Sequence, residues 1–293
     1  MTACPICSSA AAPSIRATDE NHRVSQSVFE YAACSKCGTV FIANPPDDLG
    51  RYYEADYYDI PPIERLTALA AKDRNKIDIV NRYAAGKRLL EIGPAFGVFA
   101  LQAKADGYEV DVVEMDERCC TYLRDTVGVG VTRSDAPHEA LRNLPKHDVV
   151  ALWHVLEHLP AIPELVAAAA ANLRPGGVLV VATPNPAAAQ FRLMGRHWPH
   201  LDAPRHLALV PLATLDGLAT RDGLERVFVT TDDSDARSWN RFGWQRLLMN
   251  RFRSRLMQRA MFVLGYGVAL AAAPFDRRAM RGSAYTAVFR KPA

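Results

Sequence analysis

The sequence predicts an α/β protein built on a doubly wound parallel sheet, and three observations support this class. Short apolar runs alternate with helical patterns between residues 60 and 235, the order of elements typical of parallel sheets. Hydrophobic residues make up 49% of the 293 residues, enough to bury a full core. A glycine-bearing turn follows the first apolar run, as in sheets that bind ligands at their carboxyl edge.

Each apolar run predicts a strand, and each longer amphipathic stretch between runs predicts a helix. Right-handed crossovers then bring the carboxyl ends of the strands to one edge of the sheet. The predicted strands are residues 88–92, 109–114, 129–132, 148–153, 178–182, 225–230 and 285–289, and the predicted helices are residues 98–105, 117–126, 163–173 and 212–221.

Four regions are expected along the chain. Residues 1–45 hold four of the six cysteines, and residues 46–74 form a linker with a helical entry. Residues 75–235 form the α/β domain, and residues 236–293 form a basic helical lid that returns the last strand.

Charge is distributed unevenly along the chain. The net charge is +3, yet 12 of the 35 Lys and Arg residues and only one of the 32 acids follow residue 235. An acidic body with a basic tail argues against bulk nucleic-acid binding. It favours contact between the basic end of the protein and an anionic surface. The N-terminus lacks a signal-peptide pattern, and the apolar run at residues 260–275 is shorter than a membrane span. We expect a soluble, cytoplasmic protein, and the sequence leaves peripheral membrane contact through this tail open.

The paired cysteines predict a structural zinc site. Cys4 and Cys7 form one C-x2-C pair, and Cys34 and Cys37 form a second pair 26 residues later. Each short loop can direct two thiolates at one metal, and four thiolates leave no open position for chemistry. The alternative is four free thiols that pair by chance.

The turn after the first strand has the pattern E-x-G-x-A-x-G, from Glu91 to Gly97. Such a turn lets backbone pass close to a ligand and presents helix N–H groups. Glu114 ends the next strand, where a carboxylate can accept both hydroxyls of a ribose. Together these features indicate an adenosine ligand held without a phosphate-binding loop.

These motifs, taken in order, resemble the class I S-adenosylmethionine (SAM)-dependent methyltransferases. The resemblance covers about residues 75–235 and includes Ser134-Asp135-Ala136 after the third strand and residues 148–159 at the fourth. It implies a seven-stranded Rossmann-like sheet that binds SAM and transfers its methyl group. An N-terminal cysteine knuckle ahead of such a domain is similar to known members.

The resemblance also implies a role for individual residues. The glycines line the methionine moiety, Glu114 binds the ribose, Asp135 holds the adenine amino group, and Ala136 donates its backbone N–H to the ring. Ala95 stands where the family has a glycine, and its methyl group is tolerated if the backbone there keeps a negative φ. The implied cofactor-binding residues are Glu91, Gly93, Gly97, Glu114, Asp135 and Ala136.

Histidines gather after the fourth strand, in the segment from His154 to His158, and His206 follows later. In one interpretation Glu157 and His158 cap a helix while His154 packs over SAM. In the other, His154, Glu157, His158 and His206 hold a divalent metal, an arrangement similar to O-methyltransferases with an E-x-x-E-H turn. A nitrogen-rich set suits zinc better than magnesium. The sequence favours the first interpretation.

His154 and His206 are the candidate catalytic residues if the acceptor is a hydroxyl, because a histidine can act as a base near neutral pH. Arg205, beside His206, is either a grip for an anionic substrate or a surface arginine. In the tail, a row of apolar residues at i, i+4 spacing predicts a lid helix that also touches an anionic partner. That row is Leu248, Phe252, Leu256, Ala260 and Leu264.

The predicted function is SAM-dependent methylation of oxygen on a small molecule, a sugar or a lipid-linked intermediate. One alternative is a binding module without catalysis, which Ala95 favours and the intact acids oppose. The other is a nucleic-acid methyltransferase, suggested by the knuckle and the arginines. The acidic body argues against it, as does Thr183-Pro184-Asn185, which lacks an aromatic residue to stack a flipped base.

Overall fold

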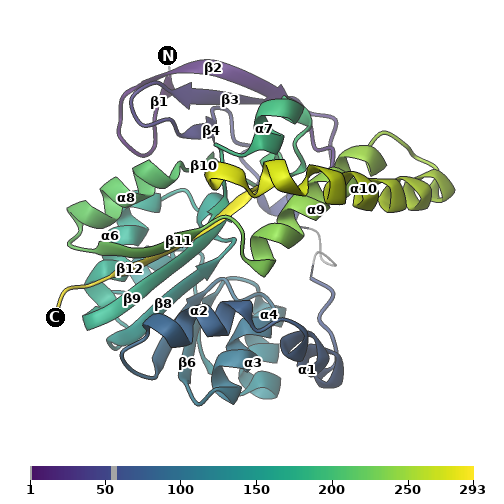
Figure 1. Ribbon diagram of the computed structural model, residues 1–293. Coiled ribbons are helices and arrows are strands. Elements are labelled where there is room, and N and C mark those ends of the chain that lie inside the picture. The colour runs from purple at the N-terminus through teal and green to yellow at the C-terminus, as the bar shows by residue number, and fades with distance from the viewer. Residues whose placement is uncertain (1, 54–57) are drawn as a thin grey trace.

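The computed structural model describes residues 2–53 and 58–293, and a seven-stranded sheet forms its centre (Figure 1). Its strands are β5 (Arg88–Ile92), β6 (Glu109–Glu114), β7 (Gly130–Arg133), β8 (His147–Trp153), β9 (Leu173–Pro184), β11 (Glu225–Thr230) and β12 (Ala284–Arg290). They lie in the order β11-β12-β9-β8-β5-β6-β7. β5 to β9 run parallel, and β12 is antiparallel to both of its neighbours. The predicted α/β class and seven-stranded sheet are confirmed.

Successive strand residues alternate between two hydrophobic cores, one on each face of the sheet. Leu89 belongs to the core that includes residues of α2 and α3, and Leu90 belongs to the core that includes residues of α6 and α8. Helices thus cover both faces (Figure 1), which is why the central strands β8 and β9 carry long buried, mostly apolar runs. The helices are α1 (Ile63–Lys72), α2 (Asn75–Tyr83), α3 (Val98–Ala105), α4 (Glu117–Tyr122), α5 (Pro137–Ala140), α6 (Ile162–Asn172), α7 (Ala189–Met194), α8 (Leu212–Arg221), α9 (Ser234–Met249) and α10 (Arg255–Asp276).

The cysteine-bearing N-terminal region forms a second, antiparallel sheet. Its strands are β1 (Thr2–Ala3), β2 (Ala10–Ala17), β3 (Phe29–Cys34), β4 (Val40–Ile42) and β10 (Ala208–Leu209). β10 is far from the other four strands in sequence, because it follows β9 of the central sheet. A buried core joins Tyr31 of β3 to Trp198 and Leu201, which lie between β9 and β10. This sheet therefore packs directly on the segment that carries His206.

The basic tail differs from the predicted single lid helix. α9 ends at Met249 and α10 begins at Arg255, so the i, i+4 row from Leu248 to Leu264 crosses a break between two helices. Leu256 is 76% exposed and Leu264 is 51% exposed. The row is not a buried stripe, because it is interrupted by the helix break and its α10 residues are exposed. α9 packs beside the site, and α10 projects from the body (Figure 1).

Candidate cofactor and acceptor site

The turn after β5 needs glycine at positions 93 and 97 for reasons of space. Gly93 has a φ of 66°, and a Cβ there would lie 2.7 Å from the side chain of Val155. Gly97 has a φ of 86°, and a Cβ there would lie 2.6 Å from the side chain of Leu123. Both values lie in the left-handed region that favours glycine. The turn thus keeps backbone exposed at the carboxyl edge of the sheet, where a cofactor could approach.

Ala95 does not meet the condition under which its methyl group was expected to be tolerated. Its φ is +52°, so an alanine occupies left-handed backbone where the family has glycine. This conformation costs about 1–2 kcal/mol for a residue with a Cβ. The N–H of Ala95 donates to Oε2 of Glu114 at 3.0 Å, and this hydrogen bond helps to hold the turn.

Glu114 is buried at the end of β6 and accepts three backbone hydrogen bonds. Besides Ala95, the N–H groups of Met115 and Asp116 donate to its Oε1 at 2.7 and 2.9 Å. Burial raises the pKa of Glu114, and the three N–H groups oppose that rise. The carboxylate is therefore fixed in position, as a ribose-binding group would have to be.

Glu91 is a second buried carboxylate, at the end of β5. Its Oε2 has no hydrogen-bond partner among the described residues. Burial raises its pKa to about 8, and Lys76 opposes that rise while Glu114 adds to it. An unpaired, buried oxygen of this kind is the mark of a site that a polar or charged ligand completes.

The predicted adenine contacts follow β7. Asp135 is exposed, and the N–H of Ala136 donates to the Ser134 hydroxyl at 3.0 Å. Their proposed roles remain predictions, and Ala136 would have to exchange this bond for one to the ring.

A cavity of about 580 Å³ lies beside the end of β8. Five histidines line it, and α9 contributes aromatic and basic side chains. The N-terminal region also reaches it, through Asn21 and His22. The histidines are His22, His154, His158, His200 and His206, and the α9 residues are Ser238, Trp239, Phe242 and Arg246.

His154 is held by a carboxylate and an indole from α9. Its Nε2 lies 2.5 Å from Oδ2 of Asp235, and its ring stacks on Trp239 with centroids 3.8 Å apart. Its other nitrogen, Nδ1, is buried without a hydrogen bond and lies 3.9 Å from Oε1 of Glu157. Burial disfavours the charged form of Asp235, but His154 holds its pKa well below the usual range. Sequence reasoning missed Asp235, because 81 residues separate the two partners.

The four-residue metal set of the less favoured interpretation is only partly assembled. The ligand atoms of Glu157, His158 and His206 all lie within 4.8 Å of one another. His154 stands outside this group, since its Nε2 is taken by Asp235. Glu157 is fully buried: Oε2 accepts from Thr183 at 2.8 Å, while Oε1 has no hydrogen-bond partner in the described structure.

Backbone carbonyls fix the tautomers of the two histidines in this group. A carbonyl only accepts, so Nδ1–H of His158 donates to Arg205 O at 3.0 Å and Nδ1–H of His206 donates to His200 O at 2.8 Å. Both rings are left with a lone pair on Nε2. Burial lowers the pKa of His158 to about 4 and also lowers that of His206, so both are neutral at pH 7. Neutral imidazoles beside an unpaired carboxylate oxygen are suited to binding a metal ion or to accepting a proton.

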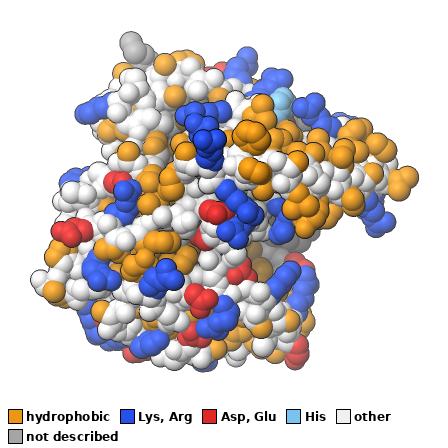
Figure 2. Space-filling view, viewed as in Figure 1, with side chains coloured by type: hydrophobic (Ala, Val, Ile, Leu, Met, Phe, Trp, Pro, Cys, Tyr) orange, Lys and Arg blue, Asp and Glu red, His pale blue; other side chains and the backbone are white. Residues whose placement is uncertain are grey.

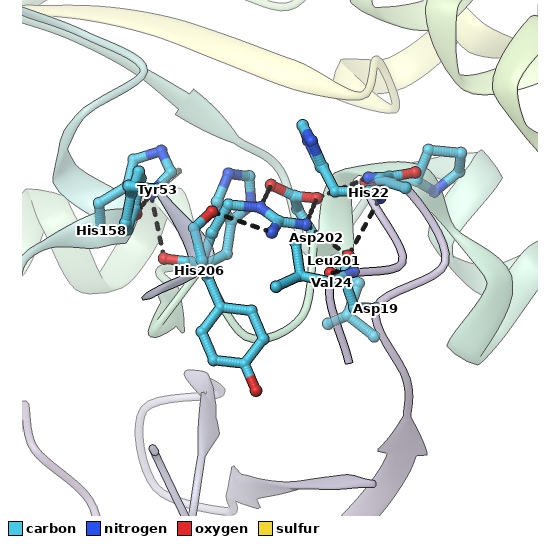
Figure 3. A network of polar contacts seen from close by, with 12 residues as sticks. Asp19, His22, Val24, Tyr53, His158, Leu201, Asp202 and His206 are labelled. Atoms are coloured by element: carbon cyan, nitrogen blue, oxygen red, sulfur yellow. Dashed lines mark hydrogen bonds and ion pairs between the residues drawn. The ribbon is translucent and has the colours of Figure 1, made fainter. Parts of the chain in front are cut away.

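Arg205 is neither a surface residue nor a substrate grip, contrary to both expectations. It is fully buried, and its guanidinium contacts Asp19 at 2.6 Å and Asp202 at 2.9 Å. Figure 3 shows this network around Asp19 and Asp202. Burial disfavours ionisation of Asp202, but Arg205 holds its pKa well below the usual range. The buried ion pairs tie the N-terminal region to the segment that positions His158 and His206.

The four paired cysteines converge as predicted. Sγ of Cys4 lies 3.6 Å from Sγ of Cys37, and Sγ of Cys7 lies 3.5 Å from Sγ of Cys34. A tetrahedral ion with bonds near 2.3 Å would separate its sulfurs by about 3.8 Å. None of the four is in a disulfide. Their arrangement fits a four-thiolate zinc site.

Comparisons with known proteins agree with this geometry. A family model described as a methyltransferase domain matches residues 64–229. A curated relative, the ubiquinone biosynthesis O-methyltransferase of Aromatoleum aromaticum, is 30% identical over 117 residues, which cover 38% of this chain and 50% of the relative. The chain thus spans about half the length of the curated relatives it matches.

Solved structures share the fold at low sequence identity. A SAM-dependent methyltransferase from Archaeoglobus fulgidus is 19% identical, with a TM-score of 0.51 and coverage of 77% of this chain and 94% of the other. Phosphoethanolamine N-methyltransferase 2 from Haemonchus contortus, in complex with SAM, is 15% identical with a TM-score of 0.55, covering 87% and 62%. These similarities confirm the architecture around the site.

Proposed function

Because the chain belongs to the methyltransferase-domain family, we propose that it transfers the methyl group of SAM to an oxygen atom of a small molecule, a sugar or a lipid-linked intermediate. The observation that carries this proposal is the His154–Asp235 pair at the wall of a large cavity beside the carboxyl edge of the sheet. The O-methyltransferase activity in the names of the curated relatives supports oxygen as the acceptor atom.

The residues around the turn fit SAM. The cofactor, when bound, supplies a methyl group on a positively charged sulfur that is already a good leaving group. Gly93 and Gly97 would leave room for its methionine moiety, and Glu114 would accept from the ribose hydroxyls. Asp135 and Ala136 would contact the adenine. Since the leaving group needs little help, positioning of the acceptor supplies most of the acceleration.

His154 is the proposed base for an acceptor hydroxyl. A carboxylate only accepts hydrogen bonds, so Nε2–H of His154 donates to Asp235 and the lone pair lies on Nδ1. The acceptor hydroxyl has to reach Nδ1, which is buried beside Glu157. Nδ1 then takes the hydroxyl proton as the oxygen is methylated, and Asp235 stabilises the imidazolium that forms. Trp239 fixes the plane of the ring. His206, whose Nε2 also lies 3.9 Å from Glu157, is the second candidate base.

A divalent metal at Glu157, His158 and His206 is the second candidate mechanism. The unpaired Oε1 of Glu157 and the two carbonyl-fixed histidines favour it. Such an ion would lower the pKa of the acceptor hydroxyl, and the nitrogen-rich set suits zinc or a similar metal. The main proposal remains a metal-free mechanism in which His154 is the base, because Asp235 already orients its ring.

The first experiment is a screen of a bacterial-type extract with labelled SAM, followed by identification of the labelled product. With that acceptor, His154→Gln should lower kcat about 100-fold or more, and Asp235→Asn about 10-fold or more, with SAM affinity unchanged. Asp232→Asn, three residues away and exposed beside Arg237, is the matched control. Full activity in the His154 variant would remove it from the mechanism.

Two further tests separate the alternative functions. A thermal shift with SAM and S-adenosylhomocysteine distinguishes an enzyme from a module that has lost the cofactor. Labelled nucleic acid in the same screen tests the third class, for which the acidic body gives no support. The proposed location is the cytoplasm.

A further inference from the structure

The helices α9 and α10 form an antiparallel hairpin, residues 234–276, which we name the α9–α10 arm. Figure 1 shows α10 projecting from the body of the molecule. α10 has 22 residues and is apolar and long enough to cross a membrane by length and composition, yet only 6% of its most apolar stretch is buried. A helix of this composition is ordinarily covered, because exposed apolar area of this extent is unfavourable in water.

Large apolar side chains are exposed along the whole of α10. It packs on α9 along one narrow line, where a Cβ on Gly265 would lie 2.5 Å from Cα of Gln245. The rest of the surface faces outward, and Figure 2 shows the resulting hydrophobic strip along the arm. Its exposed side chains include Leu256 (76%), Val263 (70%), Leu270 (62%) and Phe275 (73%).

Arginines flank this strip at both ends. Arg251, Arg253, Arg255 and Arg259 lie at the outer end, and Arg277, Arg278 and Arg281 follow α10 at the inner end; all seven are exposed. Among these seven in the described structure, Arg277 alone has a carboxylate partner, Asp232. The sequence has no acid between residues 236 and 275. An apolar strip between two sets of arginines, most of them without a carboxylate partner, complements the surface of an anionic bilayer.

We propose that the α9–α10 arm is a membrane-docking surface for anionic lipid. The apolar side chains of α10 enter the interface, and the arginines contact lipid phosphates. A second copy of the chain is a poorer occupant, because a two-fold contact through this strip would bring arginine sets together without acids to pair them.

The arm lies on the bilayer and does not cross it. Asp276, at the end of α10, is buried against the body and accepts from Trp244 at 3.0 Å and Gln190 at 3.2 Å. α9, the other helix of the hairpin, carries Arg237, Arg241 and Arg246, so it cannot serve as a second apolar span. Both helices therefore stay on the side of the membrane that holds the body.

The position of the arm also bears on the acceptor, a step that rests on the proposed function. Trp239, Phe242 and Arg246 of α9 line the cavity, and Phe242 is itself 46% exposed. Apolar side chains of the arm therefore continue into the wall of the cavity that holds His154, although polar side chains line it as well. This continuity favours the lipid-linked class among the proposed acceptors.

Vesicle flotation tests the docking surface without SAM or turnover. The full chain should bind vesicles of phosphatidylcholine with phosphatidylglycerol and bind weakly to phosphatidylcholine alone, and high salt should weaken the binding. Val263→Glu with Leu270→Glu should lower the partition constant at least about tenfold. Arg251→Gln with Arg253→Gln should lower it by about tenfold or more.

Val28→Glu with Leu69→Glu provides the matched control, because both side chains are exposed and apolar but lie away from the arm. This pair should leave binding unchanged. The proposal is overturned if the full chain ignores anionic vesicles or if the arm variants bind as well as the control. It is also overturned if ultracentrifugation shows a dimer that the Val263/Leu270 variant disperses. SAM affinity should stay unchanged in every variant, so a failure here is distinct from a failure of the proposed function.

Discussion

At the scale of single residues, the two carboxylates that end β5 and β6 differ in how they are satisfied. Glu114 accepts three backbone N–H groups, whereas Glu91 keeps one oxygen without a partner in the described structure. The same burial therefore has different consequences. The carboxylate of Glu114 is fixed in position, whereas the charged form of Glu91 lowers the stability of the folded protein.

Glu114→Ala should weaken SAM binding by roughly 1–3 kcal/mol, because the ribose hydroxyls would lose their charged acceptor. Glu109→Ala, at the exposed start of the same strand, is the control and should leave binding intact. Titration calorimetry on both variants measures the difference. Unchanged affinity in the Glu114 variant would mean that its carboxylate serves only the turn.

Glu91→Gln should change how stability depends on pH. The pKa of Glu91 is about 8 when folded and near 4.5 when unfolded, so the folded state binds the extra proton between these values. Its contribution is then fully present below pH 4.5 and lost as pH rises through 8. The variant should gain on the order of 3–5 kcal/mol relative to the parent between pH 5 and pH 9. Denaturant unfolding of the parent and the variant at the two pH values measures this difference. The same change of unfolding free energy with pH in both proteins would contradict the prediction.

The residues that sequence reasoning placed well are those with a local pattern. The glycines and acids at strand ends were found because strand periodicity gives their register. Asp235 and the Asp19–Arg205 pair were missed, since each joins segments far apart in the chain. The left-handed φ of Ala95 was missed as well, because a backbone angle follows from the packing of the turn and not from residue type.

At the scale of elements, part of the central sheet could be predicted to the residue. β5, β6, β11, α3 and α8 have the predicted bounds, whereas β9 begins at Leu173 and α4 ends at Tyr122, several residues from where they were predicted. α2 packs on the central core but was not predicted. The tail could not be predicted, because the apolar row crosses a helix break and α10 is not covered by protein. A periodic row of apolar residues predicts a buried helix face only where the fold provides a core to cover that face.

The turn after β8 (η3, Leu156–His158) gives the element-scale prediction. Chelation under conditions that spare the N-terminal cysteines should leave the methylation rate unchanged if His154 acts with Asp235 alone. His158→Ala should then lower the free energy of unfolding by about 1–3 kcal/mol, because it removes the bonds to Arg205 and Tyr53. His138→Ala, on α5 away from the cavity, is the control.

The opposite outcome identifies a metal. A rate that vanishes with chelator, returns with a divalent ion in cysteine variants, and loses this rescue in His158→Ala would show that Glu157, His158 and His206 hold a catalytic ion. The cysteine variants are needed because loss of zinc from the N-terminal site could mimic dependence on the second metal.

At the scale of the whole molecule, the N-terminal region packs against the wall of the cavity and is not a separate module. It shares β10 with the α/β domain, its Asp19 is buried against Arg205, and its Asn21 and His22 line the cavity. The sequence predicted the cysteine site but not this contact, since nothing in residues 1–45 indicates which surface they cover. Stability of the sheet should therefore be coupled to binding of the acceptor.

Metal removal tests that coupling. Purified protein should contain about one zinc per chain, and Cys34→Ser should lose it, because four thiolates converge within 4.8 Å. Loss of the ion should disorder the N-terminal sheet, since much of its stability would come from metal binding. The acceptor KM should then rise while SAM affinity stays near its original value, because Gly93, Gly97 and Glu114 lie on the central sheet and its turns. Metal analysis, hydrogen exchange of residues 2–45 and steady-state kinetics measure the three effects. A zinc-free protein with an ordered N-terminal sheet and an unchanged KM would show that the cysteines are packed thiols and that the ion pairs with Arg205 hold the sheet unaided.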